Sequence, residues 1–232
     1  MGMIKNELVK FFTSSRIFIY GGAILLFILA DNIVFEDNSP KDMLYCGFLK
    51  SNLETQIFVI PIILAPVVSD IFTQDYRSGC MKFFLLYKNR KEVFPAKAAA
   101  LVFITESMLL LVFAVLTTIY LLRNGGQVYG WKAELLKEAA LFTAALVPVL
   151  LIYAMICILF KNSGIICILV FLLVIMSDFI PRVLGDVTPR RFLWEWVLNN
   201  RYHSSDIVLF LAYSIFFAFM DIRLFVRKEI LC

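Results

Sequence analysis

Residues 98–122 read AAALVFITESMLLLVFAVLTTIYLL, a run in which Glu106 is the one charged side chain. The hydrocarbon core of a bilayer is about 30 Å thick and an α-helix rises about 1.5 Å per residue, so about 20 mainly apolar residues cross it. The stretch therefore predicts a transmembrane helix. Residues 139–160 and 207–226 have the same character and predict two more.

Three weaker apolar stretches complete the pattern, at residues 17–35, 58–72 and 164–180. The second of these extends back to about residue 52 and carries Pro61 and Pro66, which predict a kink that membrane helices tolerate. The third is short for a span. We therefore predict an all-α polytopic membrane protein, with six transmembrane helices in a single domain over residues 1–232.

Composition excludes an ordinary soluble domain. Hydrophobic residues make up 61% of the chain and charged residues 17%, against about 45–50% and about 25% in soluble proteins. The net charge of +4 could suggest nucleic acid, but the basic residues flank apolar runs, where they set membrane orientation. The five cysteines are scattered without a CxxC pair, so neither a disulfide framework nor a metal site is expected.

The positions of the basic residues predict the orientation of the chain. If the N-terminus is inside, the 22 Lys and Arg residues divide into thirteen on the cytoplasmic side and nine outside. This bias follows the positive-inside rule and places both termini in the cytoplasm, in the cell (plasma) membrane. The first apolar run is not expected to be a cleaved signal peptide, because its lead is long and no A-x-A site follows.

Two segments outside the spans have helical patterns. In residues 1–16, apolar side chains recur at helical spacing, which predicts an amphipathic elbow helix in the inner interface; the alternative is a frayed tail. In residues 181–206, Thr188 and Pro189 can begin a helix whose Phe192, Trp196 and Val197 share a face. We expect a short external helix that dips into the outer leaflet.

The predicted first cytoplasmic loop, residues 73–97, contains a second segment that needs a place to bury its apolar side chains. Residues 75–97 read DYRSGCMKFFLLYKNRKEVFPAK, too short to span and too apolar for a free loop. The segment suits docking on the membrane interface, on the bundle or on a cytoplasmic partner. The alternative is a helix that only anchors Lys and Arg to lipid headgroups.

This loop resembles that of type-2 ATP-binding-cassette (ABC) exporter permeases. Their motif has an acidic residue four before a Gly-Thr pair, then a Leu pair and downstream basic residues. Here Asp75, Gly79 and Lys97 match, whereas Cys80 replaces the usual Thr and Lys88 the usual Pro. The positions that match the family's coupling region are Asp75, Tyr76, Arg77, Ser78, Gly79, Cys80, Met81, Lys82, Phe83, Phe84, Leu85 and Leu86, with Arg90 or Lys91 in place of the motif's Arg.

The resemblance implies that this loop docks on a soluble ABC ATPase and that a second permease, identical or related, faces this chain. The chain lacks the G-x-x-x-x-G-K-[ST] phosphate loop, so ATP and Mg²⁺ belong to the partner and this chain is expected to be a transport subunit, not an enzyme, with no cofactor of its own. Its small size looks most like permeases of peptide-antibiotic export and immunity systems. A peptide, lipid-like or drug-like amphipathic substrate is implied.

Glu106 is the one carboxylate that stands clearly within a predicted span. An ionisable group at that depth is costly and should face protein or water. It either contributes to a substrate path or an inter-subunit contact, or it snorkels to the inner interface or is protonated.

Three other functional classes can be compared with these features: a membrane protease, a secondary transporter and a non-transporting membrane protein. One histidine and one clearly intramembrane carboxylate are too few for a membrane protease. A secondary transporter and a non-transporting immunity or anchor protein stay as alternatives.

Overall fold

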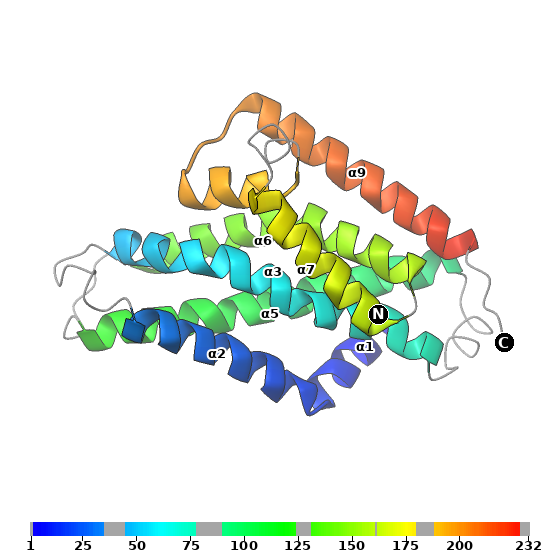
Figure 1. The fold of residues 1–232 in the computed structure, drawn as a ribbon, viewed down its shortest axis with the longest axis horizontal. Helices are drawn as coiled ribbons and strands as arrows, with labels where there is room; N and C mark the ends of the chain where they lie inside the picture. The colour runs from blue at the N-terminus through cyan, green and yellow to red at the C-terminus, as the bar shows by residue number, and fades with distance from the viewer. Residues whose placement is uncertain are drawn as a thin grey trace.

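The computed structural model describes residues 2–34, 45–77, 90–123, 131–160, 162–179 and 188–227. In these ranges the chain is helical and contains no strand, which confirms the predicted all-α class. The elements are α1 (Gly2–Thr13), α2 (Arg16–Val34), α3 (Tyr45–Arg77), α5 (Arg90–Arg123), α6 (Trp131–Leu159), α7 (Ser163–Phe179), η2 (Leu193–Leu198) and α9 (Ser204–Arg227) (Figure 1).

Five of these helices, α2, α3, α5, α6 and α9, are long and apolar enough to cross a membrane. This finding supports a multi-pass membrane protein. The sixth apolar helix, α7, has 17 residues and is about 25 Å long at the helical rise, so it is shorter than the other five. The count of six spans stays a prediction.

Three helices, α3, α5 and α6, begin several residues before their predicted starts, α6 at Trp131 instead of residue 139. α3 has 33 residues, whereas the expected span covered residues 58–72 with an extension to about residue 52. The helix adds residues 45–51 before the expected extension and 73–77 after the expected span, and Asn52 stands at the limit of that extension. Asn52 is buried because its side-chain oxygen accepts a hydrogen bond from Asn32 of α2 at 2.7 Å. Tertiary pairing therefore keeps this polar stretch helical.

α5 likewise begins at Arg90, eight residues before the expected start. Together, the longer α3 and α5 take up both ends of the expected loop 73–97. Residues 78–89 of that loop lie outside the described residues.

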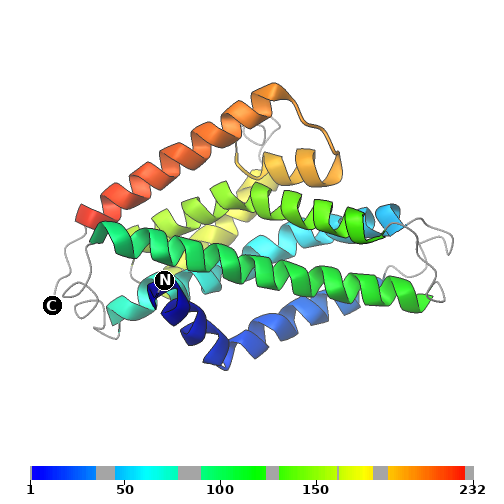
Figure 2. The same cartoon turned by 180° about the vertical axis from the view of Figure 1, so that it is seen from behind.

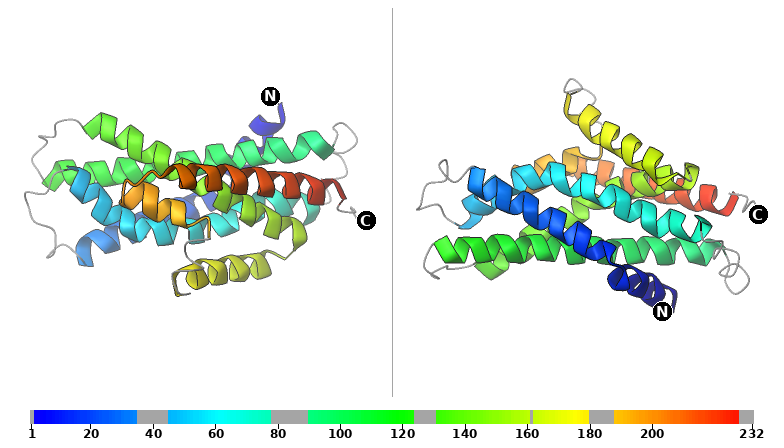
Figure 3. Two further views of the ribbon diagram at one scale, coloured as in Figure 1. Left: turned by 90° about the horizontal axis from the view of Figure 1, so that it is seen from above. Right: turned by 60° about the horizontal axis from the view of Figure 1, so that its bottom comes forward.

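The helices form one elongated bundle with α3 along its middle. α3 packs against α2, α5, α6 and α7, and α9 lies beside α6 at one side of the bundle (Figure 1). Seen from behind, α5 runs along α6, and α1 meets α2 at a sharp angle (Figure 2). α7 crosses α3 obliquely and stands out from the other helices (Figure 3).

One end of the bundle gathers α1, the last turns of α3 and α9, and the first turns of α5. We call it the α1 end. Two contacts define it: the carboxylate of Glu7 meets Lys97, and the rings of Phe94 and Phe225 lie 5.8 Å apart. At the opposite end, the rings of Tyr45 and Tyr120 lie 5.2 Å apart and join the first turn of α3 to the last turn of α5.

The segment between α7 and α9 differs from a regular α-helix. After a turn at residues 188–190 the chain forms the π-helical η2, and Phe192, Trp196 and Val197 are buried within the chain. η2 packs on α3 and α6, and Trp194 meets the Phe58 ring edge-on at 5.7 Å. This segment is therefore part of the bundle's packing. Residues 181–187 lie outside the described residues.

Candidate functional site

The α1 end holds an ionic cluster made by Glu7 and Lys10 of α1, Asp75 of α3 and Lys97 of α5. The Lys97 ammonium lies 2.5 Å from the Asp75 carboxylate and 3.3 Å from the Glu7 carboxylate. It also donates to the backbone carbonyl of Ile71 at 2.7 Å. An ammonium has three donors, so these three acceptors satisfy Lys97, which is 1% exposed.

Lys10 completes the charge balance from the solvent side. Its ammonium lies 2.9 Å from Asp75 and 3.2 Å from Glu7, so two carboxylates face two ammonium groups. Partial burial alone would lower the pKa of Lys10, but the hydrogen bond to Asp75 and the charges of Glu7 and Asp75 outweigh it and raise that pKa. Both carboxylates are buried, and a buried pair tolerates desolvation only when its groups are fully paired, as they are here.

A second ion pair extends this network along α2 and α3. Arg16 pairs with Asp70 at 2.5 Å, and the Tyr20 hydroxyl donates to the same carboxylate at 2.8 Å. The Ser14 hydroxyl accepts from the Arg16 backbone N–H at 3.3 Å, which orders the turn between α1 and α2.

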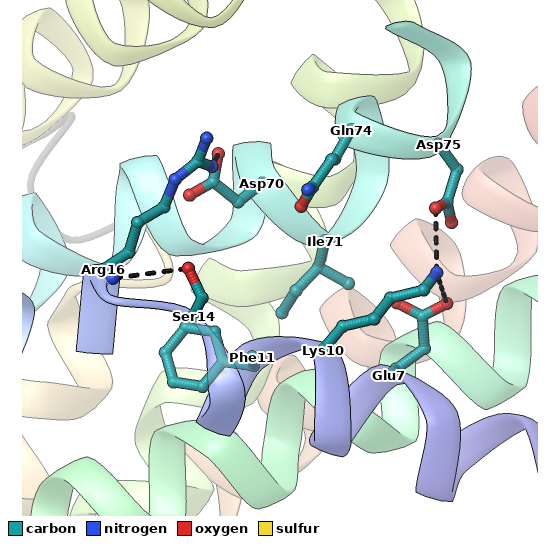
Figure 4. Close-up of a pocket in the computed structure, with 9 residues that line it drawn as sticks. All are labelled: Glu7, Lys10, Phe11, Ser14, Arg16, Asp70, Ile71, Gln74 and Asp75. Carbon is teal, nitrogen blue, oxygen red and sulfur yellow. Dashed lines mark hydrogen bonds and ion pairs between the residues drawn. The ribbon is translucent and has the colours of Figure 1, made fainter. Parts of the chain in front are cut away.

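Between the two networks lies a small cavity of about 20 Å³ (Figure 4). Its wall also includes Phe11, Ile71 and Gln74. The volume suits one water molecule and is far below that of a typical ligand site. The geometry is therefore a structural joint rather than a substrate pocket.

The joint holds both ends of residues 78–89. Asp75 stands three residues before this segment and Lys97 eight residues after it, and their ion pair joins α3 to α5, the helices that flank the segment. Because Glu7 and Lys10 join the same pair, α1, α3 and α5 are tied at one point. A load applied to residues 78–89 would reach three helices at once.

The structure describes part of the predicted coupling region. Asp75 lies in the ionic cluster, and Tyr76 and Arg77 end α3. The other coupling positions, Ser78, Gly79, Cys80, Met81, Lys82, Phe83, Phe84, Leu85 and Leu86, lie outside the described residues, so the coupling helix stays a prediction.

Glu106 lies half-buried on α5, where it meets α6. The Thr143 hydroxyl donates to its carboxylate at 2.5 Å. The carboxylate is therefore engaged within the chain, and its role in a substrate path stays a prediction.

Counting one intramembrane carboxylate was wrong. Asp221 lies within α9 and is fully buried, and Asp206 is buried in the first turn of the same helix. The sequence shows Asp221 as the one acidic residue of the apolar run 207–226, which is the same signal that singled out Glu106. Asp206 pairs with Arg191 at 2.9 Å, a contact that sequence spacing does not indicate.

Comparison with known proteins does not place this chain in a family. No protein-family model matches it, and no curated protein matches it significantly.

Proposed function

We propose that this chain is the permease subunit of an ATP-driven ABC exporter of type 2. In this proposal, residues 78–89 dock on a separate ATPase, which supplies ATP and Mg²⁺. The substrate is a peptide, a lipid-like molecule or a drug-like amphipath.

The ionic cluster at the α1 end is the observation that carries the proposal. Asp75 and Lys97 stand at the two ends of the motif that resembles the family, and they form a buried ion pair that also holds α1. Rigid-body movement of helices requires a stiff connection at the point where force enters. A paired, desolvated cluster tying three helices provides such a connection.

The bundle supports a transport role in a second way. Five helices are long and apolar enough to span a bilayer, and α9 and α2 leave most of their surface uncovered within this chain. We propose that one of these two surfaces meets the second permease, identical or related, and that the other faces lipid.

A secondary transporter is the weaker alternative. Such carriers commonly build their substrate site from helices broken near the midplane. α3 instead continues as one α-helix through Pro61 and Pro66. A non-transporting immunity or anchor protein is the other alternative. Such a protein would have no ATPase partner, so purification from native membranes distinguishes it from a transport subunit.

The test is affinity purification of the tagged chain from native membranes, followed by identification of the ATPase that accompanies it. We expect a stable complex whose ATP hydrolysis the permease stimulates. Lys82→Glu, or deletion of residues 83–86, should abolish both effects, because each changes the surface proposed to dock. Lys137→Glu is the matched control, since Lys137 is exposed in the second turn of α6 and outside the proposed docking segment.

Two results would contradict the proposal. One is the absence of any ATPase in complexes purified from native membranes. The other is normal complex formation and stimulated hydrolysis in both loop variants.

A further inference from the structure

α9 has its polarity turned inward. Its three buried residues are Asp206, Asp221 and Phe225, whereas large apolar side chains such as Ile215 and Phe216 are more than half exposed. A helix on the lipid-facing side of a bundle keeps its ionisable groups toward protein, because lipid cannot solvate them. The two acids therefore lie on the face of α9 that meets the rest of the chain, together with Phe225.

These two acids lie in different surroundings. Asp206 pairs with Arg191 and lies in the first turn of α9, where the helix dipole also favours a negative charge. Asp221 is 0% exposed, and within the described part of the chain neither of its oxygens has a hydrogen-bond partner. Asp206 thus has a charged partner, whereas Asp221 is enclosed without a hydrogen-bond partner among the described residues.

Water is kept from Asp221 on the α1 side by a row of rings. Phe225 lies one helical turn beyond Asp221 and packs on Phe94 of α5, and Phe94 packs on Phe72 of α3, each at a ring distance of 5.8 Å. All three rings are buried. The carboxyl group is therefore enclosed below the surface of the α1 end.

α9 packs against α6 and α5. On α5, Lys97 is held by Glu7 and Asp75, Glu92 is exposed, and Glu106 accepts from Thr143. On α6, the described charged residues Lys137 and Glu138 lie in the first third of the helix, and residues 145–159 carry no charged side chain; Tyr153 and Cys157 are buried in this second half. On α9 itself, Arg223 lies over the Phe219 ring at 5.0 Å, and Arg227 is exposed.

From this enclosure we propose that Asp221 is a proton-binding site that keeps α9 packed on α5 and α6. An ionised carboxylate without a partner is strongly disfavoured in a low-dielectric interior, and a group so placed neutralises instead. The packed state holds Asp221 as the carboxylic acid. When the proton leaves to water, the carboxylate that remains needs hydration, so the α1 end of α9 must part from α5.

This inference does not depend on the proposed transport function. It concerns the protonation of one side chain and the helix contact linked to it. A failure to find an ATPase partner would leave it standing.

Infrared spectroscopy of the purified protein in lipid nanodiscs tests the protonation directly. At neutral pH, we expect a carbonyl band of a protonated carboxylic acid that shifts when aspartate is labelled with ¹³C in its carboxyl group. Asp221→Asn should remove this band, and Asp221→Glu, which keeps an acid, should replace it with a band insensitive to the aspartate label. The matched control Asp206→Asn should leave it unchanged.

The wild-type spectrum tests whether Asp221 is protonated even where a variant does not fold. If labelled wild-type protein shows no aspartic-acid band at neutral pH, the proposal is overturned. The same holds if the band survives in a folded Asp221→Asn variant.

The pH dependence of unfolding tests the link to packing. The folded protein keeps a proton that the unfolded chain releases, so stability should fall as pH rises from acid to neutral. Asp221→Asn should lower the proton release on unfolding by about one proton per molecule, whereas Asp206→Asn should not. An Asp221→Asn variant that is weakened equally at every pH would contradict the proposal and indicate a packing role alone.

Discussion

The Lys97 ammonium and the Asp75 carboxylate lie 2.5 Å apart although 22 positions separate them in the chain. Their ion pair joins α3 to α5, the two helices that flank residues 78–89. The contact between Lys97 and Glu7 ties both helices to α1. The pair is buried, so its strength comes from full pairing rather than from exposure to solvent. Removing one charge should therefore do more harm than the loss of one surface ion pair.

We predict that Lys97→Met destabilises the protein by about 3–5 kcal/mol, the usual cost of leaving a buried charge without its partner. Asp75 and Glu7 would keep Lys10 as their one ammonium within this cluster. The measurement is chemical or thermal unfolding in detergent. Lys137→Met, at an exposed site on α6, should change stability by less than about 0.5 kcal/mol.

A double variant checks that the cause is the unpaired charge. Adding Asp75→Asn to Lys97→Met should recover part of the lost stability, because one buried carboxylate is removed with its partner. Purely additive losses would show that the two side chains do not act as a pair.

We predict that the contribution of Lys10 to stability is lost only in alkali. The carboxylates of Asp75 and Glu7 raise the pKa of Lys10 above its ordinary 10.5. A raised pKa in the folded state means that the contribution is fully present below 10.5 and disappears as the pH rises through the folded-state value. Since Lys10 is partly exposed, we expect a loss of a few tenths of a kcal/mol.

The check is the difference in unfolding free energy between wild type and Lys10→Met, measured from neutral pH into alkali. The difference should be constant at first and then shrink above pH 10.5. A difference that shrinks already well below pH 10.5 in this range would place the cause elsewhere.

We predict that Glu106 and Thr143 are energetically coupled across the α5–α6 contact. Hydrogen bonds between membrane helices contribute about 0.6 kcal/mol on average and up to about 1.7 kcal/mol. Thr143→Val and Glu106→Gln should each cost an amount of this size, and the double variant should cost less than their sum. The readout is unfolding of the four proteins in one detergent.

The same variants separate structure from substrate contact. If Glu106 serves a substrate path, Glu106→Gln should alter transport while Thr143→Val at matched stability should not. Equal transport in both variants would assign Glu106 to the helix contact alone.

We predict that Cys80 faces the cytoplasm. A variant that keeps Cys80 and replaces Cys46, Cys157, Cys167 and Cys232 by Ser should react with a membrane-impermeant maleimide only after the cells are permeabilised. The converse variant keeps only Cys46, which lies in the first turn of α3 toward the opposite end of the bundle. Labelling of Cys80 in intact cells would reverse the orientation and exclude docking of residues 78–89 on a cytoplasmic ATPase.

Much of the fold was visible in the sequence because spans depend on local hydropathy. The runs around residues 98–122 and 139–160 became α5 and α6, and their apolar centres lie in the predicted positions. The helix ends were harder. Lys97 was placed in the loop 73–97, and it belongs to α5 because partners on α1 and α3 satisfy its charge.

The candidate site could be predicted only in part. Asp75 and Lys97 stood out as the two ends of one motif, but their contact is tertiary and no spacing rule gives it. The role of Glu7 in α1 was likewise hidden, since an amphipathic pattern shows which face is apolar and not which charge is buried. Asp221 could have been predicted, because it is the one acidic residue in its apolar run, as Glu106 is in residues 98–122.

The contact between Glu7 and Lys97 spans 90 positions, and this sets an order on biosynthesis. Translation runs from the N-terminus, so the ribosome makes α1, α2 and α3 before Lys97 exists. Glu7 must remain hydrated at the membrane surface during that interval, because its buried partner has not yet been made. The nascent chain can dock its first helix only after α5 has emerged.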